Sequence, residues 1–67
     1  MEKELNAKAI RKYRIAKGMT VIELAKKLNV SRTMIYKYET GANMPTPKMV
    51  IKIAKVLGVE PLELLGA

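Results

Sequence analysis

The stretch from residue 20 to residue 41 constrains this chain most, because it predicts two short helices joined by a tight turn. Thr20 and Glu23 form a T-x-x-E capping box, in which the hydroxyl accepts a backbone N–H and the carboxylate reaches back to the cap. Asn29 follows the first helix and tolerates the left-handed conformation that a sharp turn needs. Ser31 is a favoured N-cap for the second helix. The pattern therefore predicts a second helix that its neighbour holds at an angle.

The two predicted helices have different faces. In the first helix, apolar residues recur at i, i+3, i+4 and i+7 and form one stripe. In the second helix, Ile35 and Tyr38 point towards the core. The side chains that point the other way are polar or basic: Arg32, Thr33, Tyr36 and Lys37. A short polar and basic helical face of this kind fits the major groove of DNA.

Start and stop signals elsewhere predict three more helices. One begins near Asn6 and runs to Lys17, with a glycine directly after it. Another begins at a Thr46 N-cap, has a proline at its first position, and runs to Leu57. A last, short helix begins at Pro61. No stretch alternates with period two, so the prediction is an all-α fold of five helices without a strand.

Length and composition narrow the function classes. Residues 1–67 make one small domain, which must be stabilised by helix packing or by a partner because there is no cysteine. Without histidine, cysteine or an obvious pairing among the six acids, we expect no metal, no cofactor and no enzymatic activity. No apolar run approaches the roughly 18 residues of a membrane span, and the first six residues lack a signal peptide's apolar segment. We therefore expect a cytoplasmic protein without membrane contact.

Basic charge is concentrated in the middle of the chain. The net charge is +7, and the segment from Lys8 to Lys55 contains twelve lysines or arginines against two acids, Glu23 and Glu39. This excess favours a polyanionic partner. The alternative is that the lysines only keep a small domain soluble.

Several fragments together resemble one known family. They are K-G-M-T, L-A-K-K-L-N-V-S, Y-E-T-G, I-A-K-V-L-G-V and a final L-L, and they cover about Ala9 to Leu65. In this order and spacing they resemble the lambda-repressor-like helix-turn-helix family, also called Cro/CI or XRE. The resemblance implies a five-helix bundle that binds double-stranded DNA, with Arg32–Thr40 as the recognition helix.

Four side chains of this recognition helix are candidates for base contacts. Arg32 lies in the first turn, where the family places base-contacting residues, and a guanidinium on guanine O6 and N7 discriminates by about 1–3 kcal/mol. Thr33 offers a hydroxyl for hydrogen bonding and a methyl group for thymine. Lys37 can reach a guanine or a phosphate, and Tyr36 a phosphate, a sugar or a thymine methyl group. The alternative is that these side chains are only solvated.

Phosphate contacts are expected at helix N-termini, where free N–H groups and the helix dipole favour an anion. Thr20 and Val21 begin one such helix, and Lys48 lies at the start of another. The family resemblance adds Thr40 and Asn43, which follow the recognition helix. Such contacts set register and affinity without reading sequence.

The chain departs from the family pattern at the beginning of the helix that follows Thr20. The family usually has glutamine at its first position and a polar residue next, whereas this chain has Val21 and Ile22. Val21 is in phase with Leu24 and can join the core. Ile22 is expected to be exposed, either as part of a contact surface or as idle surface.

The resemblance also implies a structural ion pair. In the family, an arginine late in the first helix bonds a glutamate at the end of the recognition helix, and Arg14 and Glu39 match these positions. We expect a largely buried bridge that holds the two helices together.

The leading hypothesis is a sequence-specific DNA-binding transcriptional regulator that acts as a repressor. Because one domain reads few base pairs, we expect a two-fold homodimer on half-sites about 34 Å apart. The resemblance places the dimer contacts at Pro61, Leu62 and Leu65, a short surface that favours a weak dimer formed mainly on DNA. The alternative is a protein-interaction module, such as an antitoxin or adaptor, that docks through Ile22 and Tyr36. A third option is non-specific nucleic-acid binding by charge.

Overall fold

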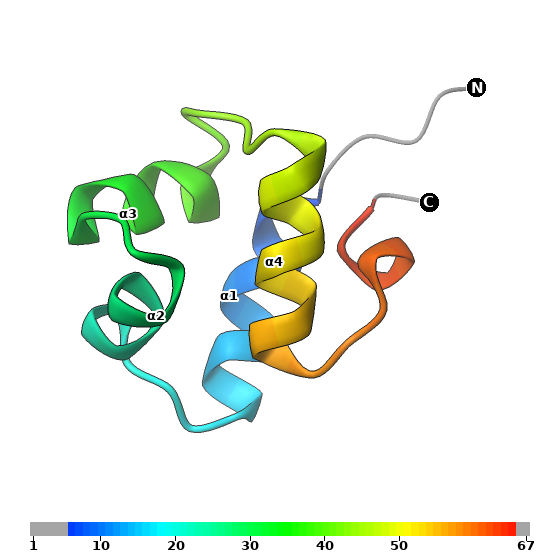
Figure 1. Cartoon of the computed structure of the whole chain (residues 1–67), viewed down its shortest axis with the longest axis horizontal. Coiled ribbons are helices and arrows are strands. Elements are labelled where there is room, and N and C mark those ends of the chain that lie inside the picture. The colour runs from blue at the N-terminus through cyan, green and yellow to red at the C-terminus, as the bar shows by residue number, and fades with distance from the viewer. Residues whose placement is uncertain (1–5, 66–67) are drawn as a thin grey trace.

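The computed structural model describes residues 6–65, and Figure 1 shows how they are arranged. The predicted all-α class is confirmed for this part of the chain. Its elements are α1 Ala7–Ala16, α2 Val21–Leu28, α3 Arg32–Thr40, α4 Pro47–Leu57 and the 3-10 helix η1 Pro61–Leu64. No strand occurs among residues 6–65. Within the same range, no helix combines the length and the hydropathy needed to cross a membrane.

Side-chain caps begin three of the helices at the predicted residues. The Thr20 capping box is closed: the Glu23 N–H donates to Thr20 Oγ1 at 3.1 Å, and the Thr20 N–H donates to Glu23 Oε1 at 3.0 Å. Ser31 and Thr46 accept N–H groups of α3 and α4 at 3.1 and 3.2 Å. Each cap satisfies a donor that has no partner within its helix, which stabilises a helix by about 1 kcal/mol. At the start of α1, Asn6 makes no such side-chain bond.

The prediction of a fifth α-helix is wrong. Residues Pro61–Leu64 form a single 3-10 turn, in which Glu63 N–H donates to Glu60 carbonyl oxygen at 2.9 Å and Leu65 N–H to Leu62 carbonyl oxygen at 3.1 Å. Four residues cannot recover the cost of nucleating an α-helix. The tighter i to i+3 pattern is the usual form of such short pieces.

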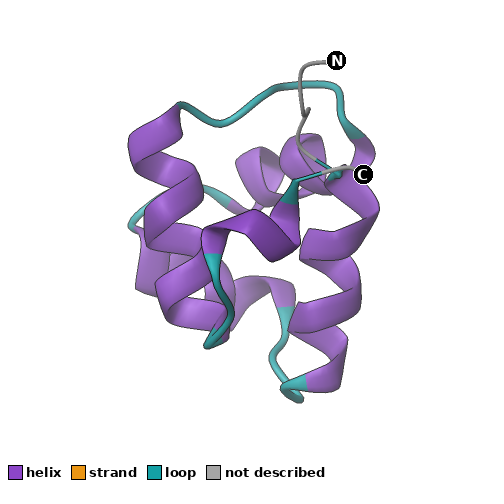
Figure 2. Ribbon diagram, turned by 90° about the vertical axis from the view of Figure 1, so that its right-hand side faces the viewer, coloured by secondary structure: helices purple, strands orange, loops and turns teal. Residues whose placement is uncertain are grey.

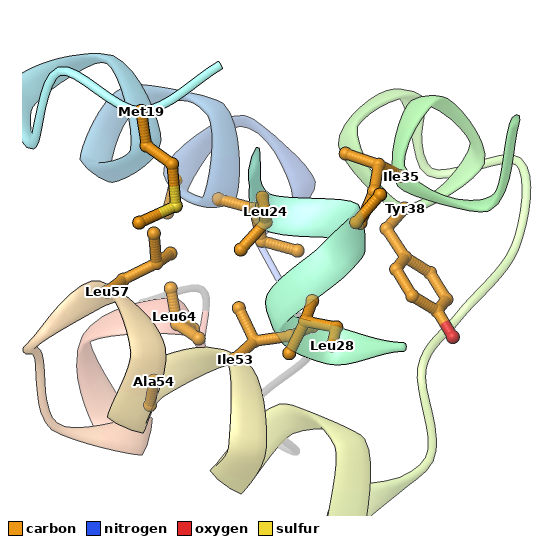
Figure 3. Close-up of a cluster of buried hydrophobic side chains, with 12 residues drawn as sticks. Met19, Leu24, Leu28, Ile35, Tyr38, Ile53, Ala54, Leu57 and Leu64 are labelled. Carbon is orange, nitrogen blue, oxygen red and sulfur yellow. The ribbon is translucent and has the colours of Figure 1, made fainter. Parts of the chain in front are cut away.

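Every element contributes a fully buried aliphatic side chain to one core. These side chains are Ile10 of α1, Leu24 and Leu28 of α2, Ile35 of α3, Ile53 of α4 and Leu64 of η1. Figure 3 shows how Leu24, Leu28, Ile53 and Leu64 converge between the helices. Because full burial of such a side chain is worth about 1.5–3 kcal/mol, this shared core holds short helices that would be marginal alone.

The core determines where the polar faces lie. In Figure 1, α2 and α3 lie on one side of α1 and α4, and η1 lies on the other side. Figure 2, at right angles to this view, shows short loops connecting the helices. The Asn6 N–H donates to the Leu64 carbonyl oxygen at 2.7 Å and ties η1 to the start of α1. The outer face of α3 is therefore presented away from η1.

Candidate nucleic-acid interface

The turn between α2 and α3 is built as its residue types predict. Asn29 adopts the left-handed conformation, with φ 57° and ψ 46°. Its N–H bonds the Lys26 carbonyl oxygen at 3.2 Å, and the Val30 N–H bonds the Ala25 carbonyl oxygen at 3.0 Å. These bonds satisfy two of the carbonyl groups in the last turn of α2, those of Ala25 and Lys26. The turn thus directs the chain into α3 without leaving α2 frayed.

Helix α3, which the family resemblance predicts to be the recognition helix, has a buried side and an exposed side. Ile35 and Tyr38 are 1% and 7% exposed and pack in the core. The side chains on its outer side are all exposed, and they are the four predicted for base contacts: Arg32, Thr33, Tyr36 and Lys37. We call these four residues the reading face. It carries two positive charges and no acid, so it is suited to an anionic partner.

The predicted phosphate contacts lie at the ends of three helices. Thr20 and Val21 begin α2, and Lys48 is exposed in the first turn of α4. The Thr20 oxygen accepts the Glu23 N–H, which leaves the hydroxyl hydrogen for another acceptor. The Thr40 hydroxyl instead donates to the Lys37 carbonyl oxygen at 3.4 Å, a long bond that a phosphate oxygen can replace. The residues that could donate are thus available at all three helix ends.

Asn43 is more constrained than the other predicted phosphate contacts. Its N–H donates to the Lys37 carbonyl oxygen at 3.2 Å, and Nδ2 lies 3.3 Å from the Met34 sulfur. A thioether is a weak acceptor. The side-chain amide can therefore exchange its weak bond to the Met34 sulfur for a bond to a phosphate oxygen at little cost. The backbone bond meanwhile keeps Asn43 next to the end of α3.

The two apolar residues at the start of α2 have different environments. Val21 is half-buried and packs against the core, whereas Ile22 is 47% exposed. Beside them, the hydrogen bonds of the Thr20 backbone and hydroxyl group lower the pKa of Glu23 below its ordinary value of 4.5. Glu23 therefore stays ionised at neutral pH, next to the N-terminus of α2, where a negative charge is favourable.

Arg14 and Glu39 form a buried pair between α1 and α3. Arg14 Nε donates to Glu39 Oε2 at 2.6 Å, and Nη2 donates to Oε1 at 3.2 Å. Nη1 donates to the Met19 carbonyl oxygen at 2.9 Å. The guanidinium therefore fixes the end of α3 against α1 and against the loop that leads into α2.

Sequence reasoning missed a groove between α1 and α3. Its lining combines charged and apolar side chains from three helices: Lys8, Arg11, Lys12, Arg14, Ile15, Val21, Tyr36, Glu39 and Thr40. The α1 residues with exposed side chains recur at i, i+3, i+4 and i+7, so they share one helical face. That spacing was readable in the sequence, but it does not say which other helix the face lies beside.

The predicted dimer contacts differ in exposure. Leu62 is 61% exposed, whereas Pro61 and Leu65 are half-buried. Between them, Leu64 is fully buried and belongs to the core. Leu62 is therefore the most exposed of the apolar side chains predicted as dimer contacts.

Among residues 6–65 no three acidic, histidine or cysteine side chains gather as metal ligands. The single ion pair in this range joins Arg14 to Glu39, and both side chains are buried between α1 and α3. The other lysines and arginines of this range therefore form no ion pair with an acid within it.

Comparison with known proteins identifies the same helix-turn-helix arrangement. A helix-turn-helix family model matches residues 10–64. An uncharacterized helix-turn-helix transcriptional regulator of Methanocaldococcus jannaschii is 46% identical over 48 residues, which cover 72% of this chain and 73% of that protein. Multiprotein-bridging factor 1c of Arabidopsis thaliana is 37% identical over 51 residues, covering 76% of this chain and 34% of that protein. The chain spans about a third or less of the first curated relatives it matches.

Solved structures share the arrangement of the helices. The biofilm master regulator SinR, in complex with DNA, superposes with a TM-score of 0.79 at 28% identity, covering 88% of this chain and 98% of that chain. The restriction-modification controller protein C.AhdI of Aeromonas hydrophila has a TM-score of 0.81 at 29% identity, covering 87% and 88%.

Proposed function

Because this chain belongs to the lambda-repressor-like helix-turn-helix family, we propose that it is a sequence-specific double-stranded-DNA-binding transcriptional regulator that acts as a repressor. The observation that carries the proposal is the reading face, an exposed and basic side of α3 whose opposite side is fixed in the core. The DNA complex of SinR supports it, since the two chains share their fold over nearly their whole lengths. The proposal assigns the chain no catalytic residue.

In this proposal α3 enters the major groove and its first two turns read base edges. Arg32 makes the most selective contact, because a guanidinium matches the two acceptors of guanine. Thr33, Tyr36 and Lys37 contact neighbouring bases or the adjacent backbone. The buried Arg14–Glu39 pair contributes by holding α3 at a constant angle, so that these side chains meet the same base edges each time.

Phosphate contacts at the ends of α2, α3 and α4 hold the domain in register. At the start of α2, Val21 stands where the family usually has glutamine, so no side chain there bonds the phosphate. The free backbone N–H groups and the helix dipole attract it instead. Thr20, Thr40, Asn43 and Lys48 add side-chain donors on either side of the reading face. These contacts raise the affinity for all sequences alike.

We further propose that two copies bind a palindromic site. A single α3 contacts only a few base pairs, whereas two copies related by a two-fold axis read half-sites about one helical turn apart. In this proposal Leu62, which is 61% exposed, joins the two copies together with the neighbouring Pro61 and Leu65. Because this surface is short, the dimer is expected to form mainly on DNA.

Selection of bound duplexes from a random DNA library, at physiological salt, tests the function. A palindromic motif is the expected result. In binding assays on that motif, Arg32→Ala should lower affinity about 5- to 150-fold, which corresponds to about 1–3 kcal/mol, and relax one base preference. Lys48→Ala should weaken selected and random duplexes by the same factor. Equal effects of both substitutions on both duplexes would contradict base readout.

A second candidate function is a protein-interaction module with the same fold. Ile22 and Tyr36 are 47% and 56% exposed, although both are large and carry apolar surface. One relative is named a multiprotein-bridging factor. In this alternative the α2–α3 surface docks a protein, as in an antitoxin or an adaptor.

Ile22→Lys separates the two candidates. The substitution places a charge on an exposed position and should leave the thermal unfolding temperature nearly unchanged. If the chain is a protein module, the variant loses a complex that wild type forms. If it reads DNA, the variant binds the selected duplex at least as well as wild type, because the added charge is positive.

A further inference from the structure

We infer that the groove between α1 and α3 holds one sugar–phosphate strand of the DNA, and that Lys8, Arg11 and Lys12 of α1 neutralise its phosphates. The inference rests on the proposed DNA binding. It extends the interface beyond the helix-turn-helix to a face of α1 that had no assigned role.

The α1 wall of the groove concentrates positive charge. Lys8, Arg11 and Lys12 are exposed and lie on one helical face at i, i+3 and i+4. Among residues 6–65 the only ion pair joins Arg14 to Glu39, so these three cations have no acidic partner there. Like charges so spaced repel each other. A polyanion in the groove removes this repulsion and releases its own counterions.

The opposite wall of the groove is continuous with the reading face. Tyr36 belongs to both surfaces, and Thr40 follows it one turn later on the same side of α3. Val21, the first residue of α2, closes the groove with a helix N-terminus that attracts anions. A strand that borders the major groove beside α3 is therefore led past Tyr36 and Thr40 towards α1.

The rest of the lining is compatible with a nucleic-acid strand. Ile15 and Tyr36, 54% and 56% exposed, offer apolar surface to deoxyribose carbons. Glu39 is the one acid in the lining, and its two oxygens accept hydrogen bonds from Arg14 at 2.6 and 3.2 Å. Its charge is therefore compensated, and it does not oppose a phosphate.

One of the three cations, Lys12, contacts an aromatic ring. Lys12 Nζ lies 5.6 Å from the centre of the Tyr13 ring, a cation–π distance. Lys8 and Arg11 make no comparable contact among the described residues. They are therefore the better pair to substitute, because their removal changes charge in the groove and little else.

The test compares two double variants that each remove two positive charges. Lys8→Gln/Arg11→Gln changes the groove. Lys26→Gln/Lys55→Gln is the control, because its residues are exposed on α2 and α4 and do not line the groove. Affinity is measured across a salt titration on a random-sequence duplex and on the duplex recovered by selection. Thermal melts should match wild type for both variants.

The groove variant should reduce the slope of log affinity against log salt by about 1.8, roughly 0.9 for each lost phosphate contact. It should weaken both duplexes by the same factor. Ethylation interference should show phosphates whose modification weakens wild type and the control variant but not the groove variant. These results would place a strand at α1.

A salt slope in the groove variant equal to that of the control variant overturns the inference. If the groove variant also loses binding to poly-L-glutamate, the groove serves an acidic polypeptide instead. Neither result touches the proposed function, which depends on the recovered motif and on Arg32→Ala. A wild-type chain that selects no motif defeats that function independently of the groove.

Discussion

Arg14 makes three hydrogen bonds with one side chain, two to the Glu39 carboxylate and one to the Met19 carbonyl oxygen. Arg14 and Glu39 are each 9% exposed, so each charge depends on the other for the solvation that water no longer provides. The pair also joins two helices whose contacting residues are 25 positions apart in sequence. At this scale, the pair should matter more for orienting α3 than for net stability.

We expect Arg14→Ala to destabilise the protein by about 3–5 kcal/mol, because it leaves the Glu39 carboxylate buried without a partner. A domain of this size has a total stability of about 3–10 kcal/mol, so the variant should lose a large fraction of its free energy of unfolding. Urea denaturation followed by circular dichroism measures the loss.

The matched control replaces both charges, as Arg14→Met/Glu39→Leu. It should recover most of the stability, since an apolar pair pays no desolvation penalty. DNA affinity should remain lower than wild type if the ion pair orients α3. A double variant as unstable as Arg14→Ala would mean that packing, and not the stranded charge, dominates the effect.

Glu23 gives the stability of the protein a small dependence on acid pH. Its pKa is lowered by the hydrogen bonds of the Thr20 backbone first and of the Thr20 hydroxyl second. Because the folded pKa lies below the unfolded one, this contribution is fully present above the ordinary value of 4.5 and is lost as the pH falls through the folded pKa.

Glu23→Gln keeps the capping bond but removes the charge. Wild type should therefore exceed the variant in thermal stability at neutral pH, and the two should converge in acid. Unfolding temperatures measured across this range provide the test. A constant difference at every pH would show that the carboxylate charge contributes nothing to the cap.

At the scale of elements, the α2–α3 turn sets the geometry of the interface. Asn29 is the only residue other than glycine with positive φ among residues 6–65. Its conformation turns the chain directly into the Ser31 cap of α3. The angle between the two helices therefore depends on one backbone conformation.

Asn29→Ala should destabilise the protein by about 1 kcal/mol, because a Cβ without a local hydrogen-bonding group is disfavoured in the left-handed region. Asn29→Gly should remain close to wild type, since glycine adopts this conformation readily. Chemical denaturation of the two variants side by side measures the contrast. Equal stability of the alanine variant and wild type would mean that the turn can be made another way.

At the scale of the whole molecule, one small core is built from all five helical elements, so no element can be removed without opening it. The surface that remains is basic at the reading face and the groove, and apolar at isolated positions such as Leu62. In the proposed function, a domain of this size contacts more base pairs of DNA by pairing two copies than a single copy can contact.

Leu62→Glu should reduce cooperative binding to a palindromic duplex by about tenfold or more, because burial of a leucine at a dimer contact is worth about 1.5 kcal/mol or more. Affinity for a duplex with one half-site should change little, since η1, the element that contains Leu62, lies on the opposite side of α1 and α4 from α3 (Figure 1). Band-shift titration on both duplexes measures the difference. A parallel loss on the single half-site would indicate that Leu62 does not act through a dimer.

The local features of the fold could be read from short windows of sequence. The Thr20, Ser31 and Thr46 caps and the Asn29 turn depend on residues within four positions, and each forms as predicted. The alternating faces of α3 followed from helical periodicity alone. The fifth helix failed because a window of apolar residues after Pro61 does not reveal that four residues are too few to nucleate an α-helix.

By itself, the sequence determined the four α-helices among residues 6–65, the caps at Thr20, Ser31 and Thr46, and the α2–α3 turn, because these depend on local hydrogen bonding and on the period of the apolar residues. The family was indicated by the resemblance of several fragments in their order and spacing. Only the tertiary structure decided which helical faces lie next to each other. The Lys8–Ile15 face of α1 forms a groove with Tyr36 and Thr40 because helix packing sets the α1–α3 angle. No window of sequence contains that angle, since it results from how all the core side chains fit together at once.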